Sequence, residues 1–258
     1  MIKTWMTPWL LMAVPFLGAA LSLLLRTSFQ RMKTSALLTT VASMLVVIGT
    51  PWALGDTLAG VPFLCLLPLT AFLSLLGQPL HRDNTSAWTT TLVLLGLGLG
   101  ILTAQAPAHD VMLLILPGLL CILLYRYQSG ATPETWRGLS AYGLSMVSAA
   151  LALVLPTPAS TVALLVTCAT LLPLLPVHSG FIATLTGLPG NLPAFLVFLL
   201  PTVGFHTLLM LLPNLTGTTL HTVAILALAG AVYGSLRALI QARPLPRLSY
   251  AALAFFGL

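Results

Sequence analysis

The chain has 258 residues, of which 58% are hydrophobic, ten are Lys or Arg and four are Asp or Glu. So apolar a composition leaves no room for a soluble domain, because a water-exposed surface needs many more charged side chains. The net charge of +6 does not indicate nucleic-acid binding, since the basic residues form no run interleaved with aromatic side chains.

Apolar runs follow one another along the chain and are separated by short connectors. A hydrocarbon core of about 30 Å is crossed by roughly 20 apolar residues in a helix. The pattern predicts an all-α, polytopic integral membrane protein of about ten transmembrane helices, the last of them short. The runs span 5–25, 35–54, 58–77, 88–106, 110–126, 138–156, 159–177, 192–213, 219–241 and 246–258.

Three connectors carry most of the polar side chains: 26–34, 78–86 and 126–138. The other connectors are brief turns rich in Pro and Gly. No segment is long and polar enough to fold on its own outside a membrane. We therefore predict a single transmembrane domain over residues 1–258.

The basic residues fall almost entirely in the odd-numbered connectors, while Lys3, Asp56 and Asp110 fall on the opposite side. Lys and Arg near span ends are retained on the cytoplasmic side. We expect an integral protein of a bacterial inner membrane, with the amino terminus outside and the odd-numbered loops cytoplasmic. The basic residues of these loops are Arg26, Arg31, Lys33, Arg82, Arg126, Arg137, Arg237, Arg243 and Arg247.

The sequence contains no pattern of a soluble enzyme. Cys65, Cys121 and Cys168 each stand alone in an apolar run, and the five histidines are widely scattered. Neither spacing is that of a metal site. Phosphate-binding loops, nucleophile elbows and ligand patterns for flavin, haem or iron–sulfur clusters are missing as well. We expect no metal, no cofactor and no catalytic residue.

Prolines interrupt two of the apolar runs. Pro173 and Pro176 lie just before His178 at the end of one run, and Pro201 lies at the middle of another. Proline deprives a helix of a backbone hydrogen bond, and a membrane helix must find another partner for the freed carbonyl. Broken helices often line a transport path, although proline is also common in purely structural spans.

The segment 170–207 is similar to the antiporter-like membrane subunits of respiratory complex I, which are related to Mrp-type cation/proton antiporters. Their pattern I-K-A-P-L-F-P-L-H and the apolar helix that follows align here without a gap. Matching positions are Pro173, Pro176, His178, Pro189 and Gly204.

Two further segments resemble the same family. The stretch 233–241, followed by Leu248, Tyr250 and Gly257, is similar to the family pattern that begins Y-x-S-x-x-A-L-x-Q. Upstream, 103–130 holds a polar residue, Asp110, before an apolar run. The resemblance implies three leading helices over 1–86, a five-helix antiporter-like repeat over 87–213, and the start of a truncated second repeat over 214–258.

The chain departs from the family at the charged residues that carry protons through the membrane interior. The resemblance places these at Leu119, Leu171, Thr202 and Leu245, and none of these side chains is ionisable. Buried ionisable groups in membranes are expensive and usually functional. Their loss predicts either an inert relative or one that uses other groups.

Four residues are the candidates for such other groups. His178 and His206 could exchange protons near neutral pH, and His206 lies one helical turn beyond Thr202. Tyr233 and Tyr250 could extend a hydrogen-bonded chain. A packing role for the histidines and interfacial anchoring for the tyrosines are the structural alternatives.

Length is the second departure, because family members continue through a second inverted repeat. The last thirteen residues of this chain span only about 20 Å as a helix. A chain end in lipid is costly unless protein or water receives it. We expect this end to pack against another subunit.

Three functions fit these patterns. The first is a non-catalytic, degenerate antiporter-like subunit that scaffolds a complex I-like proton-pumping oxidoreductase, with other integral membrane subunits and lipid as partners. The second is active proton or cation translocation through His178 and His206, or membrane partnership in inorganic-carbon uptake. The third is an unrelated transporter for a small solute, with mid-membrane candidates Thr70, Ser145, Ser148, Thr167 and Thr202.

Overall fold

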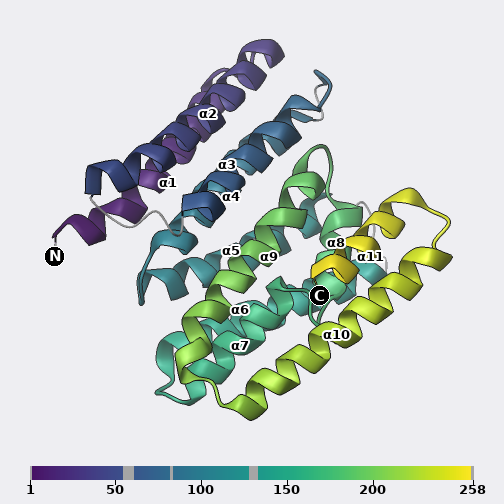
Figure 1. The fold of residues 1–258 in the computed structure, drawn as a ribbon. Coiled ribbons are helices and arrows are strands. Elements are labelled where there is room, and N and C mark those ends of the chain that lie inside the picture. Colours follow the sequence, from purple (N-terminus) through teal and green to yellow (C-terminus); the bar gives the residue numbers. More distant parts are fainter. Residues whose placement is uncertain (1, 55–60, 82–83, 128–132, 257–258) are drawn as a thin grey trace. The chain divides into compact units, whose positions relative to one another are not determined.

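The computed structural model describes residues 2–54, 61–81, 84–127 and 133–256, with the backbone alone described for 2–7, 51–54 and 61–63. The regular secondary structure of these residues is helical, with short connectors between the helices (Figure 1). The α-helices are α1 (Ile2–Leu24), α2 (Phe29–Leu54), α3 (Val61–Leu76), α4 (Thr85–Thr103), α5 (Ala108–Tyr127), α6 (Pro133–Val154), α7 (Ala159–Leu171), α8 (Ser179–Gly187), α9 (Leu192–Leu211), α10 (Gly217–Ile240) and α11 (Pro244–Phe256).

The predicted all-α class is confirmed, and each of the ten apolar runs contains a helix. Among the described residues, six helices are long and apolar enough to cross a membrane: α2, α4, α5, α6, α9 and α10. Within the same described residues, the apolar stretches of α1, α3 and α7 are shorter, at Pro8–Leu24, Leu64–Leu76 and Ala159–Leu171. The number of about ten spans is therefore not confirmed, whereas the assignment to integral membrane proteins is.

The run predicted over 159–177 is too long. α7 ends at Leu171, and α8 occupies a stretch that the sequence left as a connector. Two backbone hydrogen bonds close the end of α7, from the Leu172 N–H to the Cys168 carbonyl (2.8 Å) and from the Leu174 N–H to the Ala169 carbonyl (2.9 Å). The helix ends here because Pro173 and Pro176 have no N–H to continue it.

Pro201 does not end a helix, contrary to the sequence expectation. α9 runs from Leu192 to Leu211 with Pro201 inside it. A single proline removes one backbone donor, and the surrounding hydrogen bonds of a twenty-residue helix maintain its path.

The described residues group into two compact units. The first unit comprises Met1–Met112 and Pro189–Leu199, and the second comprises Leu113–Leu188 and Leu200–Leu258. This grouping does not bear on the repeat boundaries near residues 86 and 213, which stay predictions.

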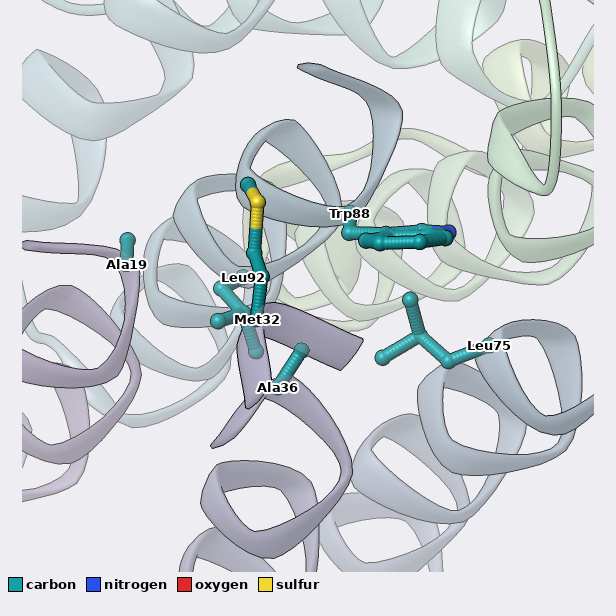
Figure 2. Packing of buried hydrophobic residues seen from close by; sticks show 6 residues of the cluster. All are labelled: Ala19, Met32, Ala36, Leu75, Trp88 and Leu92. Atoms are coloured by element: carbon teal, nitrogen blue, oxygen red, sulfur yellow. The ribbon is translucent and has the colours of Figure 1, made fainter. Parts of the chain in front are cut away.

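In the first unit, α1 packs against α2 and α4, and α3 packs against α2 and α4 (Figure 1). Figure 2 shows the Trp88 indole ring above Leu75. The cluster of buried side chains comprises Ala19, Met32, Ala36, Leu75, Trp88 and Leu92.

Polar contacts also connect the helices of the first unit. The Lys33 ammonium donates to the carbonyls of Gln78 and Leu76, at the end of α3. The fully buried Asn191 amide donates to the Thr91 hydroxyl (2.7 Å) and the Ser74 hydroxyl (3.3 Å). Buried polar groups in an apolar bundle are normally paired in this way, because an unmade hydrogen bond there is costly.

In the second unit, α6 packs against α7 and α8, and α11 packs against α8 and α10. The end of α7 is buried against α9 and α10 by an apolar cluster. Its members are Cys168, Leu172, Leu174, Ala169, Leu208, Val223 and Ala227. The connector between α7 and α8 is therefore held in place by helices that follow it in sequence.

The outer faces of the helices are apolar. On α10 the exposed large side chains include Ile225, Leu228, Val232, Leu236, Leu239 and Ile240. An aqueous surface would not tolerate so long an apolar stripe, whereas lipid or a partner helix would cover it.

Candidate functional site

Four side chains meet in the second unit, where the connector after α7 approaches α10 and α11. The His178 ring centroid lies 5.2 Å from that of Tyr233, and Tyr233 lies 6.0 Å from Tyr250, both edge to face. The guanidinium carbon of Arg237 lies 5.8 Å from the Tyr233 centroid and 5.7 Å from the Tyr250 centroid. These four residues are called the arginine–aromatic cluster below.

Local structure explains how the cluster forms. Tyr233 and Arg237 are four residues apart on α10, so both side chains project from the same face. His178 directly precedes α8, and its carbonyl accepts a hydrogen bond from the Ile182 N–H (3.2 Å). The helix break therefore sets the position of the imidazole.

Gly234 brings α11 to the cluster. A Cβ atom at this position would stand 2.8 Å from the Tyr250 carbonyl oxygen and 2.7 Å from the Ala254 amide nitrogen. Such distances are prohibitive against backbone atoms, so glycine permits an approach of α10 and α11 that a larger residue would prevent. That approach places Tyr250 against Tyr233.

The contacts in the cluster are electrostatically favourable. The Arg237 Nε donates a hydrogen bond to the Tyr233 hydroxyl (3.2 Å), and its guanidinium faces two phenol rings. Cations over ring faces and rings packed edge to face are both attractive arrangements. The cluster thus ties the α7–α8 connector to α10 and α11 through side chains.

His178 is the titratable member closest to the helix break. Its Nδ1 is buried and has no hydrogen-bond partner among the described residues. Burial, reinforced by the Arg237 charge, lowers the pKa of His178, while the nearby Pro176 carbonyl opposes this shift. His178 lies in the connector, outside the six candidate spans.

The cluster contains three of the four proton-relay candidates identified in the sequence: His178, Tyr233 and Tyr250. The fourth, His206, lies half-buried on α9, four residues after Thr202. Chemically, the cluster offers an imidazole that can exchange protons, two phenols that can donate and accept, and a fixed positive charge.

The positions where the family carries charge lie on four helices. Leu171 is the last residue of α7 and is fully buried, while Leu119 on α5 and Thr202 on α9 are half-buried. Leu245, the second residue of α11, is exposed. No ionisable side chain stands at any of the four.

Sequence reasoning missed two features. Arg237 was assigned to a cytoplasmic loop, whereas it lies in the last turn of α10; its spacing of four from Tyr233 was the available signal. His109 and Asp110 form a pair at the start of α5, with Nδ1 and Oδ1 3.0 Å apart and the imidazole almost fully buried. The two residues are adjacent in the sequence, and adjacency alone does not indicate that their side chains will pair.

Other polar side chains mostly serve helix packing. Tyr142 and Thr184 share a buried hydrogen bond of 2.7 Å between α6 and α8. Thr167 donates to the Ser145 carbonyl (3.2 Å), and Thr70 bonds carbonyls of its own helix. Within the described ranges, no group of three or more His, Cys, Asp or Glu side chains could hold a metal ion.

Comparison with models of protein families finds no match. Comparison with curated proteins also finds none.

Among solved structures, the chain is similar to a chain in the structure of respiratory complex I from Thermus thermophilus with bound aureothin. The TM-score is 0.70 at 18% sequence identity, over 96% of this chain and 62% of the other. The chain thus spans less than two thirds of the length of that structure's chain. At this level of identity the similarity concerns the fold: the chain folds like a chain of respiratory complex I.

Proposed function

We propose that this protein is an antiporter-like membrane subunit of a complex I-like assembly, where it scaffolds neighbouring subunits and carries no protons itself. The observation that carries the proposal is a fold shared over 96% of the chain with a chain of respiratory complex I. The segment-level resemblance to antiporter-like subunits supports the same assignment.

The scaffolding role rests on side-chain chemistry. Proton transfer through a membrane interior needs groups that gain and lose protons, and these are retained in membranes for that purpose. The apolar or hydroxyl-bearing side chains at residues 119, 171, 202 and 245 cannot do so. A chain that keeps the helix break and lacks the carriers is suited to holding neighbours in place.

The proposal includes a location and an orientation. We infer a bacterial inner membrane, an external amino terminus and cytoplasmic odd-numbered loops, because this arrangement places nine of the ten basic residues on the cytoplasmic side. The exposed apolar stripe of α10 supports contact with lipid or with a partner helix. The family repeats at 87–213 and 214–258 belong to the same proposal.

Extraction in a mild detergent tests the assignment. An affinity-tagged chain should bring down other integral membrane subunits, and redox-centre-bearing chains among them would identify the complex I-like setting. Recovery as a stable, well-folded monomer would contradict the scaffolding role. A zinc-dependent soluble partner would instead favour the inorganic-carbon variant.

The second candidate function is proton translocation that passes through His178. The observation that favours it is the contact of this imidazole with Tyr233, which in turn packs against Tyr250, beside a helix break. His206 on α9 is included in this alternative, since both histidines can exchange protons near neutral pH.

The two functions are separated by proton flux in vesicles that contain the assembled complex. Replacing both His178 and His206 with Leu should leave flux unchanged if the chain is a scaffold and should abolish it if the chain is a conductor. His221→Leu, at an exposed histidine on α10, is the matched control. Each assembly must first be shown to contain the full set of subunits.

A further inference from the structure

A shallow groove of about 980 Å³ lies between α1 and α2 in the first unit. α1 and α2 touch where Gly18 faces Thr39, and a Cβ atom at Gly18 would overlap the threonine side chain. The groove therefore runs along a tight helix crossing. Its apolar part is lined by Leu17, Leu21 and Leu38, all three of which are exposed.

One end of the groove is polar and positively charged. Arg31 and Gln30 line it there, and both are exposed near the start of α2. Among the described residues that line the groove, none carries a carboxylate. An anion at this end would meet a guanidinium and the positive end of the α2 dipole with no opposing charge.

A buried hydroxyl marks the same groove. Ser35 lines it with only 7% of its surface exposed, and its Oγ has no hydrogen-bond partner among the residues that the structure describes. A hydroxyl in that state in an apolar setting is costly unless something bonds to it. The Oγ is itself buried, so it would reach a phosphodiester or ester oxygen in the groove by rotation of the Ser35 side chain.

The dimensions of the groove match one leaflet of a bilayer. From Arg31 to Ala42, two lining residues on α2, the helix rises about 16 Å. Half of a hydrocarbon core of about 30 Å is about 15 Å. An acyl chain lying along the leucines would thus extend from the basic end to the bilayer midplane.

We propose that the α1–α2 groove binds one anionic phospholipid, with its phosphodiester headgroup at Arg31 and an acyl chain along Leu17, Leu21 and Leu38. The inference does not depend on the function proposed above. We expect the charge of the headgroup to determine the preference. The phosphate of an anionic phospholipid is attracted to Arg31, whereas a zwitterionic phospholipid also carries a cation that the Arg31 guanidinium repels.

Native mass spectrometry of the detergent-extracted protein tests this proposal. After delipidation, phosphatidylglycerol or phosphatidylcholine with identical acyl chains is added, and the bound lipid is counted. Wild type should retain phosphatidylglycerol preferentially, and Arg31→Gln should weaken its binding about fivefold. Arg243→Gln, at an exposed arginine outside the groove, should bind like wild type.

A second variant tests the acyl-chain part of the groove. Ala42→Phe places a ring in the apolar end and should reduce binding of both lipids without changing the preference between them. Glycerol phosphate alone should not compete, since the acyl chain provides much of the contact. Equal retention of the two lipids, an Arg31→Gln variant that binds like wild type, or full competition by glycerol phosphate would each overturn the proposal.

Discussion

Two proline-containing stretches in the second unit, 172–178 and the part of α9 around Pro201, differ in outcome. In the first, two prolines spaced three residues apart follow the helix end, and α7 stops at Leu171. In the second, α9 continues through a single proline. The two stretches are also neighbours, since Gly204 of α9 faces Leu172 and the Cys168 thiol donates to the Gly204 carbonyl (3.0 Å).

These two stretches show that a proline alone does not determine where a helix ends. One missing donor can be accommodated within a long helix, whereas two missing donors in one turn, together with a hydrogen-bonded helix end, terminate it. The terminated helix is followed by an irregular connector that places His178 against Tyr233 of α10. The continuous helix provides an unbroken face against which that connector packs.

The largest effect is expected where the two stretches touch. Gly204→Ala would place a Cβ atom 2.9 Å from the Leu172 amide nitrogen, which cannot move without shifting the end of α7. We expect a loss of about 1–3 kcal/mol in the free energy of unfolding, as for overpacked cores. Thermal unfolding of the detergent-solubilised protein measures it.

The matched control for this substitution is Gly143→Ala on α6, where nothing lies within 4 Å of the added carbon. Alanine is the better helix former, so this variant should be as stable as wild type or slightly more so. Equal melting temperatures for the two variants would show that the α7 end does not depend on close contact with α9.

A smaller loss is expected from Tyr142→Phe, which affects the helix that follows the break. The substitution removes the 2.7 Å hydrogen bond to Thr184 on α8, whose hydroxyl still donates to the Gly180 carbonyl (2.8 Å). We expect a cost of about 1 kcal/mol. Tyr125→Phe, at a side chain that is 78% exposed, should cost nothing measurable in the same unfolding assay.

The burial of His178 beside the helix break should also make the stability of the fold depend on pH. Burial lowers the pKa of His178 from its usual value near 6.5, so protons bind the unfolded chain more readily than the folded one. The stability that the neutral imidazole provides is present above that value and is lost as pH falls through the lower, folded pKa. Melting temperature should therefore fall on acidification.

Removing the imidazole tests that attribution. His178→Gln should flatten the dependence of melting temperature on pH, measured from pH 7 to pH 5, relative to wild type. His221→Gln controls for the loss of an imidazole elsewhere. An unchanged slope in His178→Gln would mean that other groups govern the acid response.

The smallest effect is expected from Arg237→Gln. It removes the hydrogen bond to Tyr233 and the cation that faces both phenol rings. Because the Arg237 side chain is only half-buried, we expect a decrease in melting temperature smaller than that of Tyr142→Phe. Arg237→Lys keeps the charge without the planar fork, so its melting temperature should lie between those of wild type and Arg237→Gln. Arg243→Gln should not alter the melting temperature.

Hydropathy was sufficient to predict where most helices lie, because long apolar runs and the punctuating prolines are local signals. It failed at 172–191, where the apolar content continues while the backbone turns and re-forms as α8. Hydropathy reports the apolar content of a segment. It carries no information on where the backbone hydrogen bonds of a helix stop.

The candidate site was predicted only in part for a related reason. His178, Tyr233 and Tyr250 were selected individually from the family resemblance, whereas their contact depends on Gly234 and on the packing of α8 against α11. Arg237 was counted as a loop charge, because a rule about topology treats every arginine near a span end alike. Which helices meet is a property of the folded chain.

The buried amide of Asn191 has a consequence for biogenesis. Its partner Thr91 precedes it by 100 residues. At synthesis rates of about 5–20 residues per second, that interval is about 5–20 s. During it, the Lys33 contact with the end of α3 can already form, and the Thr91 hydroxyl can already donate to the Ala87 carbonyl of its own helix. The contact of Asn191 with Thr91 is therefore added to the amino-terminal helices only after the chain has been extended through α8.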